Sequence, residues 1–255
     1  MSFKVVIPAR YASTRLPAKA LADIGGRPMV QWVVAAAGKS GADEVLVATD
    51  DERVAAAAID RSGRNVGIMT RADHQSGTDR IAEVATQRGW SDDTIVVNVQ
   101  GDEPKLPSVL IDQVAELLAK TPAADIATLS TPITSLHEFL DPNVVKVVTA
   151  RSGLALYFSR APIPWHRDGA SRGLTSQTSI QGAQRHLGIY AYRVAALRSL
   201  TAMPPSDLEM TERLEQLRAL QTGMQIAVSV ASEVPGVGVD TPEDLERVRA
   251  QLHPV

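Results

Sequence analysis

Three cationic side chains in one loop near the N-terminus have the types and the spacing to do chemistry. Arg10, Arg15 and Lys19 follow the apolar run 3–8 (FKVVIP), which predicts a buried strand. In open α/β sheets, ligands bind beyond the carboxyl ends of the strands. Two guanidinium groups and an ammonium group at such a place suit a polyphosphate, because Arg binds phosphate through paired hydrogen bonds and Lys adds a mobile charge. The alternative is a surface loop whose cations contact only water.

Two carboxylates in distant parts of the chain are candidates for a metal site. Asp102 follows the run 94–99 (TIVVNV), the most strand-like stretch of the chain, and Asp240 directly precedes Thr241-Pro242, which is typical of a helix start. A carboxylate at the end of a central strand can hold Mg²⁺. Ordinary roles in a turn or a cap are the alternatives for both residues.

The segment 71–80 (RADHQSGTDR) combines helix-capping residues with two arginines. Ser76, Thr78 and Asp79 can cap a helix that runs through residues 81–84, and the free N–H groups of a helix start attract anions. Capping explains residues 76–79, but it leaves Arg71 and Arg80 unexplained.

A third group of polar residues lies in the second half of the chain. In the expected strand 186–193, His186, Gly188 and Tyr190 share one face. Glu215 and Gln216 lie off the apolar stripe of a helix expected over 211–221, with Thr211 as its cap and Met210, Leu214 and Leu217 toward the core. The polar residues of the strand can floor a sugar pocket or simply face solvent, and Glu215 and Gln216 by themselves suit a solvated helix face.

The order of the expected elements indicates the fold class. The strand 3–8, the helix 28–39, the strand 44–49, an Ala-rich helix and the strand 66–70 predict parallel pairing with right-handed crossovers. No Gly-x-Gly-x-x-Gly follows the first strand and no Gly-x-x-x-x-Gly-Lys occurs, so the sequence argues against a standard dinucleotide site or P-loop.

The composition is typical of a globular protein and argues against several classes of function. The 255 residues are 44% hydrophobic and 22% charged, with a net charge of −3, which gives no global attraction to nucleic acid or to an anionic membrane. The absence of cysteine excludes disulfides and thiol chemistry. We find no signal peptide and no transmembrane stretch, and we expect a cytoplasmic protein.

Five separated motifs together resemble the cytidylyltransferases that activate 3-deoxy-manno-octulosonate (Kdo), the CMP-Kdo synthetase family. They are P-A-R-x-x-S-x-R-x-P-x-K-x-L from Pro8, N-x-Q-G-D-E-P from Asn98, H-x-G-I-Y-A-Y-R from His186, L-E-Q-L-R from Leu214 and V-D-T-P-E-D-L from Val239. The segment 71–80 also looks like the family's R-x-x-H-x-S-G-T-D-R. The usual opening loop has Gly where this chain has Ala18, so we expect a slightly different loop conformation, because a positive φ would strain Ala.

The resemblance implies a single domain over residues 1–255 of the nucleotide-diphospho-sugar transferase type. This fold is a Rossmann-like, mostly parallel α/β sheet flanked by helices. Residues of roughly 125–200 are expected to form a subregion for sugar binding and dimerisation. The implied reaction transfers CMP from CTP to Kdo, which gives CMP-Kdo and pyrophosphate for lipopolysaccharide synthesis by a homodimer.

The resemblance also assigns the site residues. The catalytic residues are Lys19, Asp102 and Asp240, and the two aspartates hold the cofactor Mg²⁺. The nucleotide is bound by Arg10, Ser13, Arg15, Lys19, Arg71, Ser76 and Gly77. The sugar is bound by Arg80, Gln100, Arg160, His186, Tyr190, Glu215 and Gln216, with Arg160 or His186 on its carboxylate.

Two other functions stay open at this point. A cytidylyltransferase for another acidic sugar, such as 8-amino-Kdo or sialic acid, fits the opening loop equally well, whereas the segments 186–193 and 214–218 favour an eight-carbon acid. A non-catalytic nucleotide-binding module would have no use for both carboxylates and all three loop cations.

Overall fold

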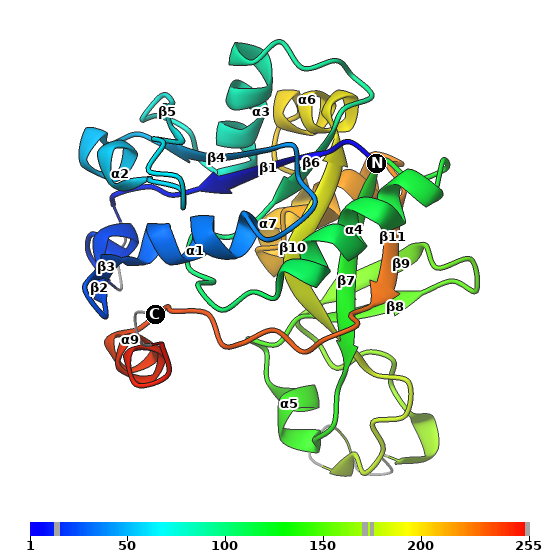
Figure 1. Cartoon of the computed structure of the whole chain (residues 1–255). Helices are drawn as coiled ribbons and strands as arrows, with labels where there is room; N and C mark the ends of the chain where they lie inside the picture. Colours follow the sequence, from blue (N-terminus) through cyan, green and yellow to red (C-terminus); the bar gives the residue numbers. More distant parts are fainter. Residues whose placement is uncertain (13–15, 170–172, 174–175, 253–255) are drawn as a thin grey trace.

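The computed structural model describes residues 1–12, 16–169, 173 and 176–252. Its main sheet has nine strands, of which seven follow the order β11-β7-β10-β6-β1-β4-β5, while β8 and β9 form a hairpin beside β10 (Figure 1). The strands are β1 (Lys4–Pro8), β4 (Glu44–Thr49), β5 (Gly67–Met69), β6 (Ile95–Asn98), β7 (Ile126–Pro132), β8 (Lys146–Thr149), β9 (Ala155–Ser159), β10 (Gln184–Arg193) and β11 (Ile226–Val230).

Strand β1 lies inside the sheet and pairs in parallel with β4 on one side and β6 on the other. Its residues Val5, Val6 and Ile7 are fully buried, as the apolar run predicts for a strand covered on both faces. Of the seven strands on the path, only β10 runs antiparallel to its neighbours. The prediction of a mostly parallel α/β sheet is therefore confirmed.

Two layers of helices cover the sheet. On one face α1 (Met29–Ala37), α2 (Glu52–Ala57) and α4 (Ser108–Lys120) pack against a core that includes Leu187, Ile189 and Ala191 of β10. On the other face α3 (Gly77–Gln87), α6 (Val194–Ala202) and α8 (Gln216–Gln221) pack against a second core with Tyr190 and Tyr192. The alternation expected along 186–193 is thus confirmed, but both faces are covered.

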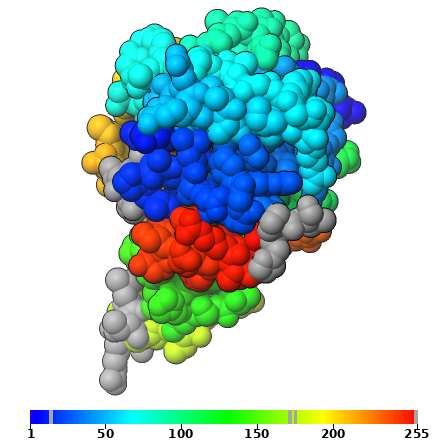
Figure 2. Space-filling view, turned by 60° about the vertical axis from the view of Figure 1, so that its left-hand side comes forward, coloured from blue at the N-terminus to red at the C-terminus, as the bar shows by residue number. Residues whose placement is uncertain are grey.

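The C-terminal helix α9 (Pro242–Arg249) lies against the N-terminal segment, as Figure 2 shows in red and blue. Leu245 and Val248 of α9 form a small core with Ile24 and Met29. Ile24 belongs to a two-stranded sheet, β2 (Asp23–Ile24) with β3 (Arg27–Pro28), which follows the 3₁₀ turn η1 (Lys19–Leu21). This packing brings the end of the chain back beside the opening loop.

The helix expected over 211–221 is interrupted in the structure. It consists of α7 (Asp207–Glu212), which Ser206 caps in place of Thr211, and α8, with Arg213 between them in a left-handed conformation at φ 54°. Leu214 and Leu217 are buried as expected, whereas Met210 is 51% exposed. The prediction failed because tertiary contacts of Glu212 and Arg218 turn the chain at Arg213, and local periodicity does not report such contacts.

The hairpin β8–β9 is fixed by a buried lysine. Lys146 is fully buried, and its ammonium donates to the carbonyls of Asp141, Val144 and Arg160 at 2.9, 2.6 and 2.6 Å. Burial lowers the pKa of Lys146, and the negative charges of Asp141 and Glu212 oppose this shift. The short helices α5 (Leu136–Leu140) and η2 (Arg167–Gly169) lie in the same half of the molecule.

Candidate active site

A cavity of about 400 Å³ lies at the carboxyl ends of β1 and β6, where the sheet topology predicts a ligand site. Eight of the predicted site residues line it: Arg10, Lys19, Ser76, Gly77, Arg80, Gln100, Asp102 and Asp240. Gly101 belongs to the same wall, and a side chain there would come within 2.8 Å of the carbonyl oxygen of Pro8. The motif around Asp102 therefore needs glycine for β1 and the strand-end loop to meet.

Lys19 contacts both of the aspartates that line the cavity. Its Nζ lies 2.6 Å from Oδ2 of Asp102 and 3.1 Å from Oδ1 of Asp240. The two aspartates converge because the backbone N–H of Val239 donates to the carbonyl of Asp102 at 2.9 Å. The structure thus brings together, around one ammonium group, the three residues predicted to be catalytic.

The residue before Lys19 has an uncommon backbone conformation. Ala18 has φ 55° and ψ 30°, in the left-handed region that favours glycine. Ala18 thus adopts the left-handed geometry despite its side chain, and the expected difference from the usual glycine-containing loop stays a prediction. Such a geometry costs an L-residue about 1–2 kcal/mol, and it directs Lys19 into the cavity.

The two aspartates fit a magnesium ion. Mg²⁺ prefers oxygen ligands, and proteins usually hold it through one or two carboxylates together with water and substrate phosphates. In the described part of the chain, no group of three or more His, Cys, Asp or Glu side chains could hold a metal ion. Two carboxylates alone would suit an ion that is shared with a polyphosphate substrate.

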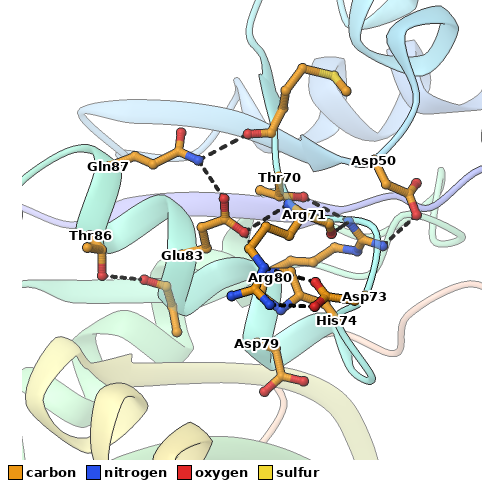
Figure 3. Close-up of polar contacts among 12 residues, drawn as sticks. Asp50, Thr70, Arg71, Asp73, His74, Asp79, Arg80, Glu83, Thr86 and Gln87 are labelled. Carbon is orange, nitrogen blue, oxygen red and sulfur yellow. Dashed lines mark hydrogen bonds and ion pairs between the residues drawn. The ribbon is translucent and has the colours of Figure 1, made fainter.

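Arg80 of α3 lines the main cavity. Its side chain extends toward Asp50 and Thr70 (Figure 3). Its side chain is almost fully buried, and Nη2 lies 2.7 Å from Oδ2 of Asp50. Its Nη1 donates to Oγ1 of Thr70 at 2.8 Å and to the carbonyl of Arg71 at 3.1 Å. Asp50 in turn accepts from the backbone N–H of Tyr11 at 3.3 Å, so one carboxylate ties the opening loop to α3.

Arg71 and His74 have different surroundings, although both belong to the segment 71–80. The Arg71 guanidinium is exposed and donates to Asp73, with 2.9 Å between Nε and Oδ1, and it does not line the main cavity (Figure 3). His74 does line the cavity, and its Nε2 contacts the carboxylate of Glu83. The nucleotide contact predicted for Arg71 stays a prediction.

His186 and Tyr190 lie together behind the main cavity on the face of β10 toward α8. Their ring centroids are 5.2 Å apart, and Phe158 packs edge-on against His186 at 5.1 Å. Nε2 of His186 lies 3.1 Å from Oγ1 of Thr128. Burial, together with nearby Arg185, lowers the pKa of His186 to about 3, so its imidazole is neutral at physiological pH.

Glu215 and Gln216 begin α8 beside the first turn of α3. A carboxylate oxygen of Glu215, Oε2, accepts a hydrogen bond from Oγ1 of Thr78. Burial raises the pKa of Glu215, and the hydrogen bonds from Thr78 and Ser76 oppose this shift. Among the described residues, Nε2 of Gln216 is buried without a hydrogen-bond partner. A buried amide donor of this kind is available to a ligand hydroxyl.

Arg160 lies at the corner between β9 and α7, outside the lining of the main cavity. Its Nε donates to the carbonyl of Glu212 at 2.6 Å and its Nη1 to the carbonyl of Pro142 at 3.0 Å. The Glu212 carboxylate accepts from Ser159 Oγ at 2.6 Å and from the Arg160 N–H at 2.9 Å. These bonds hold the turn three residues before Glu215, and a contact of Arg160 with the sugar stays a prediction.

Comparison with known proteins identifies the family. The sequence profile described as cytidylyltransferase matches residues 4–226. Over 252 residues, 99% of this chain and 99% of the relative, the sequence is 56% identical to the 3-deoxy-manno-octulosonate cytidylyltransferase of Thioalkalivibrio sulfidiphilus (strain HL-EbGR7). The chain belongs to the cytidylyltransferase family. The resemblance inferred from the five motifs is confirmed.

Solved structures agree with this family. CMP:2-keto-3-deoxy-manno-octonic acid synthetase complexed with CTP is similar at a TM-score of 0.86 and 42% identity, over 98% of this chain and 97% of that one. A 4-diphosphocytidyl-2C-methyl-D-erythritol synthase has a TM-score of 0.61 at 14% identity, over 98% and 97%, and shows the fold alone. No helix among the described residues is long and apolar enough to cross a membrane.

Of the predicted nucleotide-binding residues, Ser13 and Arg15 lie outside the described residues. Three residues of the site were not predicted from the sequence: Asp50, Thr78 in its contact with Glu215, and Glu212. Asp50 follows β4, next to β1, so the rule for strand ends could have found it. The roles of Thr78 and Glu212 depend on contacts with residues 137 and 53 positions away, which carry no local signal.

Glu103 is a further acidic group beside the predicted metal ligands. Burial, together with the negative charges of Asp102 and Asp240, raises its pKa to about 7. It lines a second cavity of about 90 Å³ with His186 and Gly188. Gly188 also accepts a 3.4 Å hydrogen bond from Gln100, which lines the main cavity, so the two cavities are neighbours.

Proposed function

We propose that this enzyme transfers CMP from CTP to 3-deoxy-manno-octulosonate, forming CMP-Kdo and pyrophosphate for lipopolysaccharide synthesis. The observation that carries the proposal is the convergence of Lys19, Asp102 and Asp240 in a cavity bordered by Ser76 and Gly77 at the start of α3. Cations, paired carboxylates and a helix start are the groups that an enzyme needs to bind a triphosphate and stabilise its reaction. The relative named as a Kdo cytidylyltransferase supports this acceptor.

The nucleotide end of the site positions the α-phosphate for attack. Arg10 and Lys19 line the cavity and bring positive charge to the triphosphate, with Ser76 and Gly77 at the helix start opposite them. The sugar hydroxyl attacks the α-phosphorus in line and pyrophosphate leaves, so catalysis consists mainly of orientation and charge neutralisation. In this proposal Lys19 moves from the aspartates to the phosphates as the nucleotide binds.

Asp102 and Asp240 would hold the Mg²⁺ that the family implies. When bound, the ion polarises the phosphate and lowers the pKa of the attacking hydroxyl. The ammonium of Lys19 lies between the carboxylates, and this contact supports a position for positive charge there.

The sugar end offers hydrogen bonds in place of a second cluster of cations. Because His186 is neutral, it binds the sugar as a donor or an acceptor and carries no charge to its carboxylate. Gln100 faces the main cavity, and the unpartnered amide of Gln216 is suited to a hydroxyl of the sugar tail. These hydrogen-bonding groups suit a polyhydroxylated acid. Arg80 and Arg160, the two arginines predicted at the sugar, are the candidates for binding its carboxylate.

We further propose that the enzyme is a cytoplasmic homodimer. The hairpin β8–β9 carries Leu156 at 63% exposed, and Trp165 in the following connector is 39% exposed. Exposed apolar side chains on one segment favour association with a second copy. Light scattering on the purified protein measures the mass directly, and a monomer at micromolar concentration would contradict the dimer.

Pyrophosphate release with each nucleoside triphosphate, against Kdo, 8-amino-Kdo and sialic acid, tests the proposal. We expect turnover with CTP and Kdo that requires Mg²⁺. The Asp102→Asn protein is the matched control for contaminating activity. A strong preference for the amino sugar or for sialic acid would keep the reaction class and overturn the acceptor, whereas CTP binding without turnover on any acid would overturn the enzyme itself.

A further inference from the structure

Thr78 connects the nucleotide motif to the sugar-binding helix. It is the second residue of α3, only 2% exposed, and it does not line the main cavity, although Ser76 and Gly77 just before it do. Its Oγ1 donates to Oε2 of Glu215, 137 residues away in the chain. A side chain from the motif expected at the nucleotide therefore contacts a residue expected at the sugar.

Tyr192 of the central sheet is a neighbour of Thr78. Its side chain is 4% exposed on β10, and burial raises the pKa of the Tyr192 hydroxyl, whereas Thr78 has the smaller, opposite effect. A threonine hydroxyl has one proton to donate, and here the carboxylate of Glu215 accepts it. The direct connection from α3 to the start of α8 is therefore the bond between Thr78 and Glu215.

Glu215 needs such a partner because little else fixes it. It follows the left-handed turn at Arg213, it precedes the first residue of α8, and its side chain makes no capping hydrogen bond to that helix. A buried carboxylate is costly unless hydrogen bonds satisfy it. Ser76 also lowers the pKa of Glu215, and its Oγ caps α3 by accepting from the backbone N–H of Asp79 at 3.1 Å. Thr78 is not the cap of α3, so a substitution at Thr78 tests the contact with Glu215 without removing a helix cap.

We propose that Thr78 is a positioning residue for the acidic sugar, acting through the Glu215 carboxylate and not through the nucleotide. This inference rests on the proposed sugar contact of Glu215. With Oε2 held by Thr78, Oε1 remains to accept a sugar hydroxyl in a fixed direction. Without the hydroxyl of Thr78 the Glu215 carboxylate can turn. Ordering this carboxylate on binding then reduces the binding free energy of the sugar.

Steady-state kinetics of Thr78→Val, Thr78→Ser and Glu215→Gln test the proposal. We expect Thr78→Val to raise KM for Kdo about three- to tenfold, with KM for CTP within twofold of the parent, because one hydrogen bond to a charged group is lost. Thr78→Ser keeps the hydroxyl and should restore KM for Kdo. Thr86→Val is the matched control, since Thr86 is exposed on the same helix and its hydroxyl donates to the carbonyl of Ala82 within that helix.

The double variant Thr78→Val/Glu215→Gln separates this inference from the proposed function. If Thr78 acts through Glu215, the double variant should be no worse for KM of Kdo than Glu215→Gln alone. Additive effects, or a rise in KM for CTP alone, would overturn the role of Thr78 while leaving Glu215 at the sugar. A Glu215→Gln protein with unchanged KM for Kdo would overturn both. Should Thr78→Val not fold, Thr78→Ala in the same cycle answers the question.

Discussion

The proposed nucleotide side and the proposed sugar side of the site, called the nucleotide side and the sugar side below, are built by different means. On the nucleotide side, Arg10, Asp50 and Asp102 lie in the loops that follow β1, β4 and β6, three adjacent parallel strands whose ends meet at one edge. On the sugar side, the residues come from the antiparallel strand β10 and from the turn between α7 and α8. There, side-chain hydrogen bonds to Glu212 and Glu215 determine the geometry.

The geometry of the two sides therefore depends on different interactions. Parallel strands fix the nucleotide side through backbone pairing, which single substitutions hardly disturb. The sugar side depends on a few buried bonds, each worth about 0.5–3 kcal/mol. Substitutions on the first side should therefore reduce turnover without moving the backbone, whereas those on the second side should loosen the binding of one substrate. The predictions below test this division, from the largest expected effect to the smallest.

The largest effect is expected at the paired carboxylates. Asp102→Asn and Asp240→Asn should each lower kcat by about 10² or more, because a metal ion's stabilisation of the transition state is worth several kcal/mol. Thermal melting should stay close to that of the parent, since the strand end and the α9 cap do not depend on these charges. Near-normal Mg²⁺-dependent turnover in either variant would show that the metal lies elsewhere.

Lys19 provides a test in which two readouts move in opposite directions. Lys19→Ala should lower kcat/KM for CTP about tenfold or more, because a charge-assisted phosphate contact is lost. In the nucleotide-free protein the same change should tighten Mn²⁺ binding, because the ammonium 2.6 Å from Asp102 and 3.1 Å from Asp240 competes with any cation there.

Electron paramagnetic resonance of Mn²⁺ measures this affinity without turnover. Lys19→Arg, which keeps the charge, is the control and should bind Mn²⁺ no better than the parent. Equal Mn²⁺ affinities in the parent and Lys19→Ala would mean that the ammonium does not occupy the metal site in solution.

The nucleotide side was largely predictable from the sequence, and the comparison explains why. Arg10 and Asp102 lie in loops just after strands, and Asp240 precedes a capped helix, so local patterns predict their places. The sheet topology predicts that Arg10 and Asp102 meet. The capping box of Thr241 and Asp244 at the start of α9 is present as the dipeptide Thr241-Pro242 suggested. The strands around this side match the expected ranges within about one residue at each end, whereas the Ala-rich helix, expected over 52–61, ends at Ala57.

The sugar side was predictable only in part. The alternation along β10 predicted the face of His186 and Tyr190, but periodicity over 211–221 predicted one helix where Arg213 turns the chain. That turn is stabilised by Ser159 and Arg160, which lie some fifty residues earlier, and no local signal reports their contact with Glu212. Neutral His186 is likewise a consequence of tertiary burial, which the residue type alone does not specify.

A substitution at Glu212 should disturb the geometry of the sugar side without removing a group that is expected to contact the substrate. In Glu212→Gln, an amide nitrogen replaces one of the two oxygens that accept from Ser159 Oγ and the Arg160 N–H, so one donor loses its partner. We expect KM for Kdo to rise about three- to tenfold, with KM for CTP unchanged. Asp207→Asn, on the exposed side of the same helix, is the control. An equal rise in both KM values would mean that the two sides are not energetically separate.

The pH dependence of stability reports the burial of His186. Its pKa of about 3 lies below the ordinary value of 6.5, so between these values the folded protein binds fewer protons at this site than the unfolded chain. This contribution is complete above pH 6.5 and is lost as the pH falls toward 3. His186→Gln should therefore flatten the acid side of the stability curve, measured by urea unfolding from pH 4 to pH 7. Parallel curves for parent and variant would show that His186 is accessible to protons.

The smallest effect is expected at Ala18, which has its counterpart on the sugar side. Ala18 and Arg213 are non-glycine residues with positive φ, at 55° and 54°, and each precedes a functional residue by one or two positions. Ala18→Gly removes the steric cost of this conformation, about 1–2 kcal/mol, but raises the entropy of the unfolded chain by about 0.4–1 kcal/mol. A net gain of about 0.5–1 kcal/mol in the free energy of unfolding is expected, with kcat near that of the parent because Lys19 keeps its direction.

Ala20→Gly is the matched control, since Ala20 is buried in η1 without a positive φ and should lose stability on the same change. If Ala18→Gly destabilises the protein as much as Ala20→Gly does, then the left-handed turn before Lys19 is not the conformation of the loop in solution. Stabilisation together with a fall in kcat would instead mean that Ala18 gives up stability to restrict Lys19.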